Sequence, residues 1–181
     1  MTPLEQLLLA KSVRYGDFVL ASGQRSSYYI DCRLTTMSAE GMVLIGRAGL
    51  AAIRDAAWEA TTVGGLTLGA DPVAYAIAAA SFGSGAVLDA FSVRKEAKGH
   101  GTRRLIEGNL VPGSSVVIVE DVITSGSSAL QAIQAVRGEG GQIAGVLAVV
   151  DREQGGRQAL ESAGYSVRSL TTSSAMGLGK T

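Results

Sequence analysis

The stretch that decides the fold runs from Val116 to Ser128 and reads VVIVEDVITSGSS. It begins with four β-branched apolar residues, a pattern typical of a strand that is buried on both faces of a parallel sheet. Two adjacent carboxylates, Glu120 and Asp121, follow, and then a loop rich in hydroxyl groups leads into a helical pattern. Ligands of open α/β sheets bind beyond the carboxyl ends of the strands. We therefore expect a ligand site between Glu120 and Ser128.

The second half of this stretch suits an anion, because loop N–H groups and a helix N-terminus together bind phosphate. Gly126 lets the backbone come close to a ligand, and hydroxyl donors are available on Thr124, Ser125, Ser127 and Ser128. The two carboxylates would repel a phosphate, whereas each can accept two hydrogen bonds from a vicinal diol. The pattern therefore predicts a site for a phosphorylated ribose. The alternative is a plain helix N-cap, where Ser and Thr are also common.

On either side of this stretch, strand and helix patterns alternate. Predicted strands cover residues 17–21, 27–31, 61–63, 86–93, 116–119, 146–150 and 165–170. Predicted helices cover residues 3–11 behind a Thr2 capping box, 38–60, 71–81 capped by Asp71-Pro72, 127–137, and a stretch ending near 163. This order implies an α/β fold with a mainly parallel sheet flanked by helices. The small, polar residues 171–181 are expected to fray.

The composition narrows the function classes. The 181 residues fit a single domain, and 16 basic residues balance 16 acidic ones, so no overall charge favours nucleic acid or a membrane surface. One cysteine and one histidine exclude a disulfide within the chain and a Cys/His zinc site. We see no secretory signal and no membrane span, so a cytoplasmic location is expected.

A second anion-binding segment follows the strand predicted at 86–93. Residues 94–104 hold five basic side chains against one acidic side chain, Glu96, and the sole histidine, His100, stands between two glycines. The basic residues are Arg94, Lys95, Lys98, Arg103 and Arg104. This pattern indicates a lid that binds an anion where charge develops, although a solvated basic loop has the same composition.

The segment 116–128 resembles the diphosphosugar-binding signature of the type I phosphoribosyltransferases. Three further segments are similar to the orotate-using branch of that family: 18–23 with 27–31 to its N-terminal hood, 94–101 to its catalytic loop, and 151–156 to the segment that reads the base. The resemblance spans about 18–170. It implies one domain over 1–181, with a hood at about 1–35, a core at 36–170 and a flexible tail at 171–181.

The same resemblance implies roles for individual residues. The diphosphosugar would be bound by Arg94, Lys95, Lys98, His100, Glu120, Asp121, Val122, Ile123, Thr124, Ser125, Gly126, Ser127 and Ser128. The catalytic residues would be Lys98, His100 and Asp121, and the base would contact Tyr28, Tyr29, Thr124 and Arg152. Arg152 would pair with a carboxylate on the base. The alternative interpretations are a surface arginine at a strand end and core aromatics in a strand.

The resemblance also implies the reaction and its requirements. The ribosyl group of phosphoribosyl diphosphate would pass to orotate, with Mg²⁺ held mainly by diphosphate and water rather than directly by protein ligands. Family members are homodimers whose catalytic loop can reach the neighbouring subunit. Two alternatives remain open: a related transferase that uses a purine, and a ligand-sensing regulator that keeps the fold without catalysis.

Two positions depart from one branch of the family. That branch has lysines where this chain has Ala21, in the hood, and Gly69, in the loop before the predicted helix at 71–81. We interpret both as differences between branches, with the diphosphate contact near Gly69 left to backbone N–H groups or lost.

Overall fold

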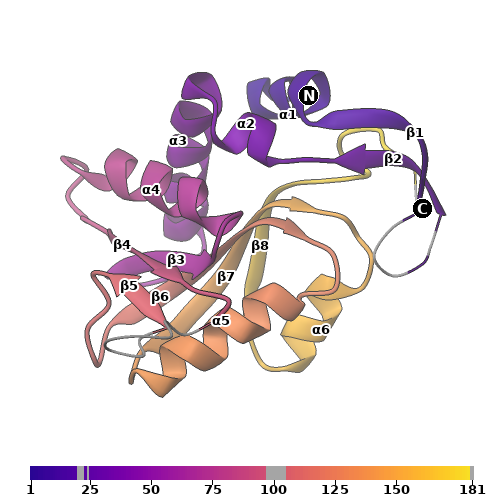
Figure 1. Ribbon diagram of the computed structural model, residues 1–181. Coiled ribbons are helices and arrows are strands. Elements are labelled where there is room, and N and C mark those ends of the chain that lie inside the picture. Colours follow the sequence, from indigo (N-terminus) through magenta and orange to yellow (C-terminus); the bar gives the residue numbers. More distant parts are fainter. Residues whose placement is uncertain (20–22, 24, 97–104, 180–181) are drawn as a thin grey trace.

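The computed structural model describes residues 1–19, 23, 25–96 and 105–179, and its centre is a six-stranded sheet (Figure 1). The strand order is β5-β4-β3-β6-β7-β8. The strands are β3 (Thr62–Leu66), β4 (Asp89–Val93), β5 (Ile106–Gly108), β6 (Ser115–Ile123), β7 (Gln142–Asp151) and β8 (Val167–Thr172). Only the pairing of β4 with β5 is antiparallel among these described strands. The predicted α/β class with a mainly parallel sheet is confirmed.

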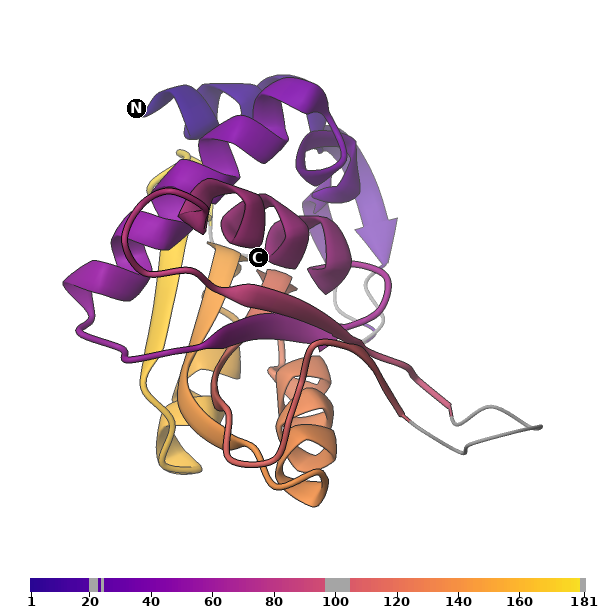
Figure 2. The same cartoon turned by 90° about the vertical axis from the view of Figure 1, so that its left-hand side faces the viewer.

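Helices cover both faces of the sheet, as Figures 1 and 2 show. On one face lie α1 (Pro3–Lys11), α2 (Arg33–Thr36), α3 (Ala39–Asp55) and α4 (Ala70–Ser81), and on the other lie α5 (Ser127–Gly138) and α6 (Gly156–Ser162). The alternation of side chains along β6 serves both layers, since Val117 and Val119 join the core under α3 and α4, whereas Val116 and Ile118 join the core above α5. This two-sided burial explains the unbroken apolar run at the start of β6.

A separate two-stranded antiparallel ribbon is formed by β1 (Val13–Val19) and β2 (Arg25–Ile30). Thr171 of β8 donates a hydrogen bond to Glu5 of α1 at 2.9 Å, which ties the helix that precedes the ribbon to the sheet. In the ribbon itself, the ring centroid of Tyr28 lies 4.9 Å from the Arg152 guanidinium. The ribbon therefore contacts the loop that follows β7.

Several predicted elements differ from the structure in their bounds. The strand predicted at 116–119 continues to Ile123, so the carboxylates lie within β6 rather than in a loop after it. The helix predicted from Asp71 begins at Ala70, and the helix predicted to reach residue 60 ends at Asp55. The short elements α2 and β5 were not predicted, because four- and three-residue segments carry too little periodicity.

The C-terminal stretch also differs from the flexible tail that we expected. Residues 171 and 172 pair in β8, and the Ser173 N–H donates to the Asp151 carbonyl at 2.9 Å. Met176 and Leu178 are only 3% and 4% exposed and join the main core. Two isolated apolar residues among small polar ones are a weak pattern in sequence, but here they close one side of the core. None of the described helices is long and apolar enough to cross a membrane.

We expect Met176→Ala to lower the free energy of unfolding by about 2–3 kcal/mol, because it removes a buried side chain and leaves a cavity. Urea denaturation should show a lower midpoint with an unchanged slope. Met37→Ala is the matched control, because Met37 is an internal methionine that is 48% exposed. If both variants unfold at the wild-type midpoint, the C-terminal stretch frays in solution as the sequence suggested.

Candidate active site

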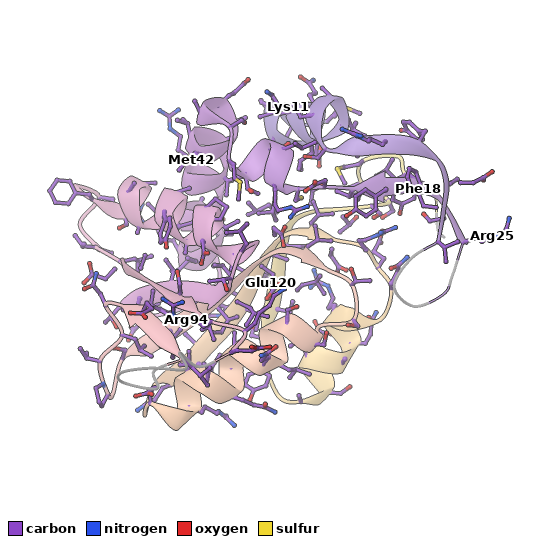
Figure 3. All side chains as sticks on the ribbon, in the orientation of Figure 1. Lys11, Phe18, Arg25, Met42, Arg94 and Glu120 are labelled. Carbon is purple, nitrogen blue, oxygen red and sulfur yellow. The ribbon has the colours of Figure 1, made fainter. Side chains whose placement is uncertain are left out.

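A cavity of about 700 Å³ lies beyond the carboxyl ends of β3, β6 and β7 and is bounded by the end of β2. Figure 3 shows Glu120 near the middle of the molecule, between the β1/β2 ribbon and α5. The residues predicted from the sequence that line this cavity are Tyr29, Lys95, Glu120, Asp121, Val122, Thr124, Ser125, Ser128 and Arg152. The structure therefore brings together residues from four separate segments of the chain.

A smaller hollow of about 180 Å³ adjoins the first and is formed by the loop between β6 and α5. It contains the remaining predicted loop residues, Ile123, Gly126 and Ser127. Gly126 precedes α5 with φ of 80°, a left-handed conformation that glycine adopts without strain. The Ser125 and Ser127 hydroxyls lie 3.1 Å apart. Clustered hydroxyls at the N-terminus of a 12-residue helix form a site suited to a phosphate group.

The two carboxyl groups of β6 are both shifted toward the protonated form. Burial, and then the charge of Asp121, raise the pKa of Glu120 to about 8. Glu120 is 6% exposed and its Oε1 has no hydrogen-bond partner among the described residues. Burial also raises the pKa of Asp121, although its Oδ1 accepts a hydrogen bond of 2.9 Å from the Val122 N–H. A buried carboxyl without a partner indicates that a polar ligand group belongs beside Glu120.

Gly69 lies close to the Asp121 side chain. A Cβ atom at Gly69 would lie 2.5 Å from the Asp121 Oδ1, closer than such atoms approach each other in proteins. The turn Thr67–Gly69, which contains a cis peptide bond between Thr67 and Leu68, lines the large cavity together with Asp121. A side chain at position 69 would therefore displace the carboxylate.

Arg152 is buried, contrary to the alternative of a surface arginine. It is 7% exposed, and its Nε and Nη2 have no hydrogen-bond partner within the described ranges. Its guanidinium packs over the ring of Tyr28. Tyr28 is 2% exposed and does not line the cavity, whereas Tyr29 does. A buried cation without a counter-ion is costly. The site therefore favours an anionic group beside Arg152.

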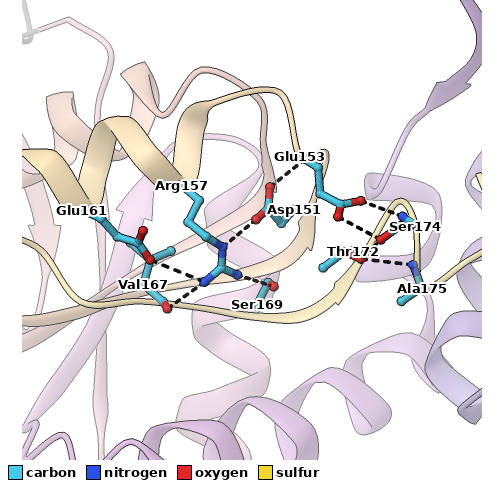
Figure 4. Close-up of polar contacts among 9 residues, drawn as sticks. All are labelled: Asp151, Glu153, Arg157, Glu161, Val167, Ser169, Thr172, Ser174 and Ala175. Atoms are coloured by element: carbon cyan, nitrogen blue, oxygen red, sulfur yellow. Dashed lines mark hydrogen bonds and ion pairs between the residues drawn. The ribbon is translucent and has the colours of Figure 1, made fainter. Parts of the chain in front are cut away.

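The residues on both sides of Arg152 are held by a polar network (Figure 4). The Asp151 carboxylate accepts from Arg157 Nε at 2.8 Å and from the Glu153 N–H at 2.8 Å. The Glu153 carboxylate in turn accepts from the N–H and hydroxyl of Ser174, at 2.7 and 2.8 Å. These contacts tie the Arg152 loop to α6 and to the C-terminal turn, and so fix the position of the arginine.

The predicted basic loop is only partly described. Arg94 lies 3.0 Å from the Glu107 carboxylate of β5 and is not among the residues that line the large cavity. Lys95 lines the cavity. Lys98 and His100 fall outside the described residues. The structure therefore places Lys95 at the site and leaves Arg94 turned toward β5.

Part of the cavity wall was not predicted from the sequence. Cys32 and Arg33, at the junction of β2 and α2, line it, as do residues 66–68 at the end of β3. Asp31, from the segment that resembles the hood, and Gly69, expected near the diphosphate, line it as well. The strand predicted at 61–63 continues to Leu66 and pairs with β6, so its carboxyl end meets the same edge of the sheet. The glycines at 64 and 65 concealed this continuation, since glycine is uncommon within strands.

A mainly parallel sheet with an acidic pair at the end of β6 and a phosphate-type loop before α5 is typical of α/β proteins that bind a phosphorylated sugar. Comparison with known proteins agrees with this class, because residues 40–171 match the phosphoribosyl transferase domain family. Over 98% of the chain, it is 43% identical to an orotate phosphoribosyltransferase from Rhodopirellula baltica, covering 94% of that protein. It is 46% identical to the Aquifex aeolicus orotate phosphoribosyltransferase over 92% of each chain.

Solved structures support the same family assignment. The Mycobacterium tuberculosis H37Rv orotate phosphoribosyltransferase in complex with phosphoribosyl diphosphate superposes with a TM-score of 0.81, at 42% identity over 97% of both chains. An adenine phosphoribosyltransferase from Leishmania donovani, at 17% identity and a TM-score of 0.66, shares the fold alone. The chain belongs to the phosphoribosyltransferase family, and within it to the orotate phosphoribosyltransferases.

Proposed function

We propose that this protein transfers the 5-phosphoribosyl group of phosphoribosyl diphosphate to orotate, giving orotidine 5′-phosphate and diphosphate in de novo pyrimidine (UMP) synthesis. The observation that supports orotate most directly is the buried guanidinium of Arg152, with two nitrogen atoms that lack partners in the described part of the chain. Orotate carries a carboxylate on a flat ring. An arginine fork pairs with such a group through two parallel hydrogen bonds.

Each part of the substrates would have its own part of the cavity. The loop between β6 and α5 would hold the 5′-phosphate, Glu120 and Asp121 the ribose hydroxyls, and Arg152 with Tyr29 and Thr124 the base. The base nitrogen would attack the anomeric carbon while its bond to diphosphate breaks. Lys95, and the Lys98 and His100 expected from the sequence, would stabilise the departing negative charge.

Mg²⁺ is part of the proposal and fits the donor set of the site. No group of three or more acidic, histidine or cysteine side chains in the described ranges could hold a metal ion. A Mg²⁺ ion that is bound mainly by diphosphate oxygens and water needs no such group. The ion would neutralise charge on the leaving diphosphate. We further propose a cytoplasmic homodimer in which the catalytic loop is shared between subunits.

Two alternatives are less well supported. A purine base has no carboxylate and would leave Arg152 buried and unpaired. A regulator that senses the same ligand would keep the acid pair as well, but the similar curated proteins are named as transferases.

The test is the loss of orotate absorbance with purified protein, phosphoribosyl diphosphate and Mg²⁺, with adenine and hypoxanthine as competing bases. Magnesium-dependent consumption of orotate alone, which collapses in Lys98→Ala, is the expected result. Consumption of a purine instead would favour the first alternative. Binding of phosphoribosyl diphosphate without turnover of any base would favour the regulator.

The network around Arg152 gives a further expectation. Glu153→Ala should raise KM for orotate about tenfold, because a small displacement of Arg152 weakens its oriented contact with the orotate carboxylate. The KM for phosphoribosyl diphosphate should stay unchanged, since Glu153 does not line the large cavity. Glu161→Ala is the control, because Glu161 lies 3.8 Å from the same Arg157 but does not contact the Arg152 loop. Equal effects on both substrates would point to general destabilisation instead.

A further inference from the structure

Three of the described side chains that line the large cavity are cationic: Arg33, Lys95 and Arg152. Arg152 is buried against Tyr28 at the end proposed for the base. Lys95 follows β4, while Arg33 is the first residue of α2 and approaches from another wall. Arg33 has no place in the function proposed above, so its position in the cavity requires an explanation.

Arg33 and the carboxylate that would hold the ribose line the same cavity. Burial raises the pKa of Asp121, the charge of Arg33 opposes this shift and the charge of Asp31 adds to it, so both groups are within electrostatic reach of Asp121. Arg33 also shares a second, shallower hollow with Leu68, in the turn after β3. The turn Thr67–Gly69 itself carries no charged side chain. A negative ligand group between Asp121 and this turn needs a cation from another element.

Asp31 holds the Arg33 guanidinium in place and leaves some of its N–H groups available to a ligand. Its Nε donates to Asp31 Oδ1 at 2.8 Å and its Nη2 donates to Asp31 Oδ2 at 3.0 Å. These bonds use two of the five N–H groups of a guanidinium. The side chain is 48% exposed at the rim of the cavity, where a ligand can reach the remaining three. A group that carries several negative charges would bind there despite the single charge of Asp31.

The position of Arg33 distinguishes between the two phosphate-bearing ends of the sugar. The hollow suited to the 5′-phosphate is lined by Glu120 and residues 122–129, and Arg33 is not among its residues. Arg33 lies near Asp121 and the turn after β3, the part of the cavity left for the group on the anomeric carbon. That group is the diphosphate.

We propose that Arg33 binds the diphosphate of phosphoribosyl diphosphate, and that Asp31 is a positioning residue that holds the guanidinium at the cavity rim. This inference rests on the function proposed above for its choice of ligand.

The experiment is calorimetric titration of inorganic diphosphate in the presence of Mg²⁺, together with steady-state kinetics. Arg33→Ala should weaken diphosphate binding and raise KM for phosphoribosyl diphosphate by about 10- to 100-fold, the range for a lost charged hydrogen bond. The KM for orotate should stay within about twofold. Arg33→Lys should restore part of the affinity, because it keeps the charge without the fork. Arg47→Ala, an exposed arginine on α3, is the control.

The outcomes separate this inference from the proposed function. Equal diphosphate affinity in wild type and Arg33→Ala, with both melting at the same temperature, would overturn the role of Arg33. Diphosphate binding that depends on Arg33, in a protein that does not consume orotate, would support the inference and contradict the proposed base. A wild-type protein that does not bind diphosphate would contradict both.

Discussion

Replacing Arg152 with leucine is expected to lower kcat/KM for orotate by about 100- to 1,000-fold, since truncating one partner of a buried charge pair costs about 2–5 kcal/mol. The guanidinium is 7% exposed, so water cannot replace the lost hydrogen bonds to the orotate carboxylate. The affinity for phosphoribosyl diphosphate should change by less than about threefold. Steady-state kinetics with each substrate varied in turn measures both effects.

The same substitution should leave the ligand-free protein at least as stable as wild type. Arg152 is buried with two nitrogen atoms that have no partner in the described chain, and its guanidinium packs over the ring of Tyr28. Replacing a buried, incompletely paired ion by an apolar residue of similar volume is often neutral or stabilising by about 1–4 kcal/mol. A loss of activity without a loss of stability would show that the arginine is retained for the ligand.

Arg168→Leu is the matched control, because Arg168 lies exposed on the neighbouring strand β8. It should retain wild-type kinetics with orotate. A second comparison uses uracil, which has the ring of orotate without the carboxylate. The preference for orotate over uracil should largely disappear in Arg152→Leu. If the variant keeps this preference, another residue recognises the carboxylate.

How much of this molecule could be predicted depends on how local each signal is. The unbroken apolar run at Val116–Val119 and the hydroxyl-rich loop after it specify strand β6, helix α5 and the kind of ligand within thirteen residues. The capping box of α1 is equally local, and Thr2 and Glu5 form both of its hydrogen bonds. In these segments the sequence pattern and the structure agree because the interactions that fix them lie close together in the chain.

The features that could not be predicted depend on distant contacts. Arg33 becomes part of the cavity only because α2 is folded toward the end of β6, far away in sequence. Gly69 is constrained by Asp121, and Met176 is buried only because the C-terminal turn packs against the core. The positive charge of Arg94 made it a plausible ligand of the diphosphosugar, but the unpredicted strand β5 supplies Glu107 as its partner. Each of these outcomes requires the tertiary fold and leaves no periodic pattern in the sequence.

Glu120→Gln is expected to stabilise the ligand-free protein at alkaline pH and to leave it unchanged at acidic pH. Burial and the charge of Asp121 raise the pKa of Glu120 from 4.5 to about 8. Between these two values the folded protein keeps a proton on Glu120 that the unfolded chain has released. The contribution of Glu120 to stability therefore falls as the pH rises through this range, and the loss is complete above a pH of about 8.

Glutamine has the shape of the protonated carboxyl group and does not titrate, so the variant escapes this loss. The stability difference between variant and wild type should grow from near zero at about pH 4 to several kcal/mol at about pH 9. The shift of the pKa sets an upper limit of about 5 kcal/mol. Urea unfolding of both proteins across this pH range measures the difference directly. Glu139→Gln, an exposed glutamate that follows α5, should show no such dependence.

The gain in stability should be accompanied by a loss of function. An ionised carboxylate accepts hydrogen bonds from both hydroxyls of a ribose, whereas an amide offers one acceptor and one donor group. We expect KM for phosphoribosyl diphosphate to rise about tenfold or more in Glu120→Gln, in line with a lost charged hydrogen bond. A stability difference that does not vary with pH would contradict the raised pKa. A variant that is more stable at alkaline pH yet binds the sugar as wild type would show that Glu120 does not contact the ribose.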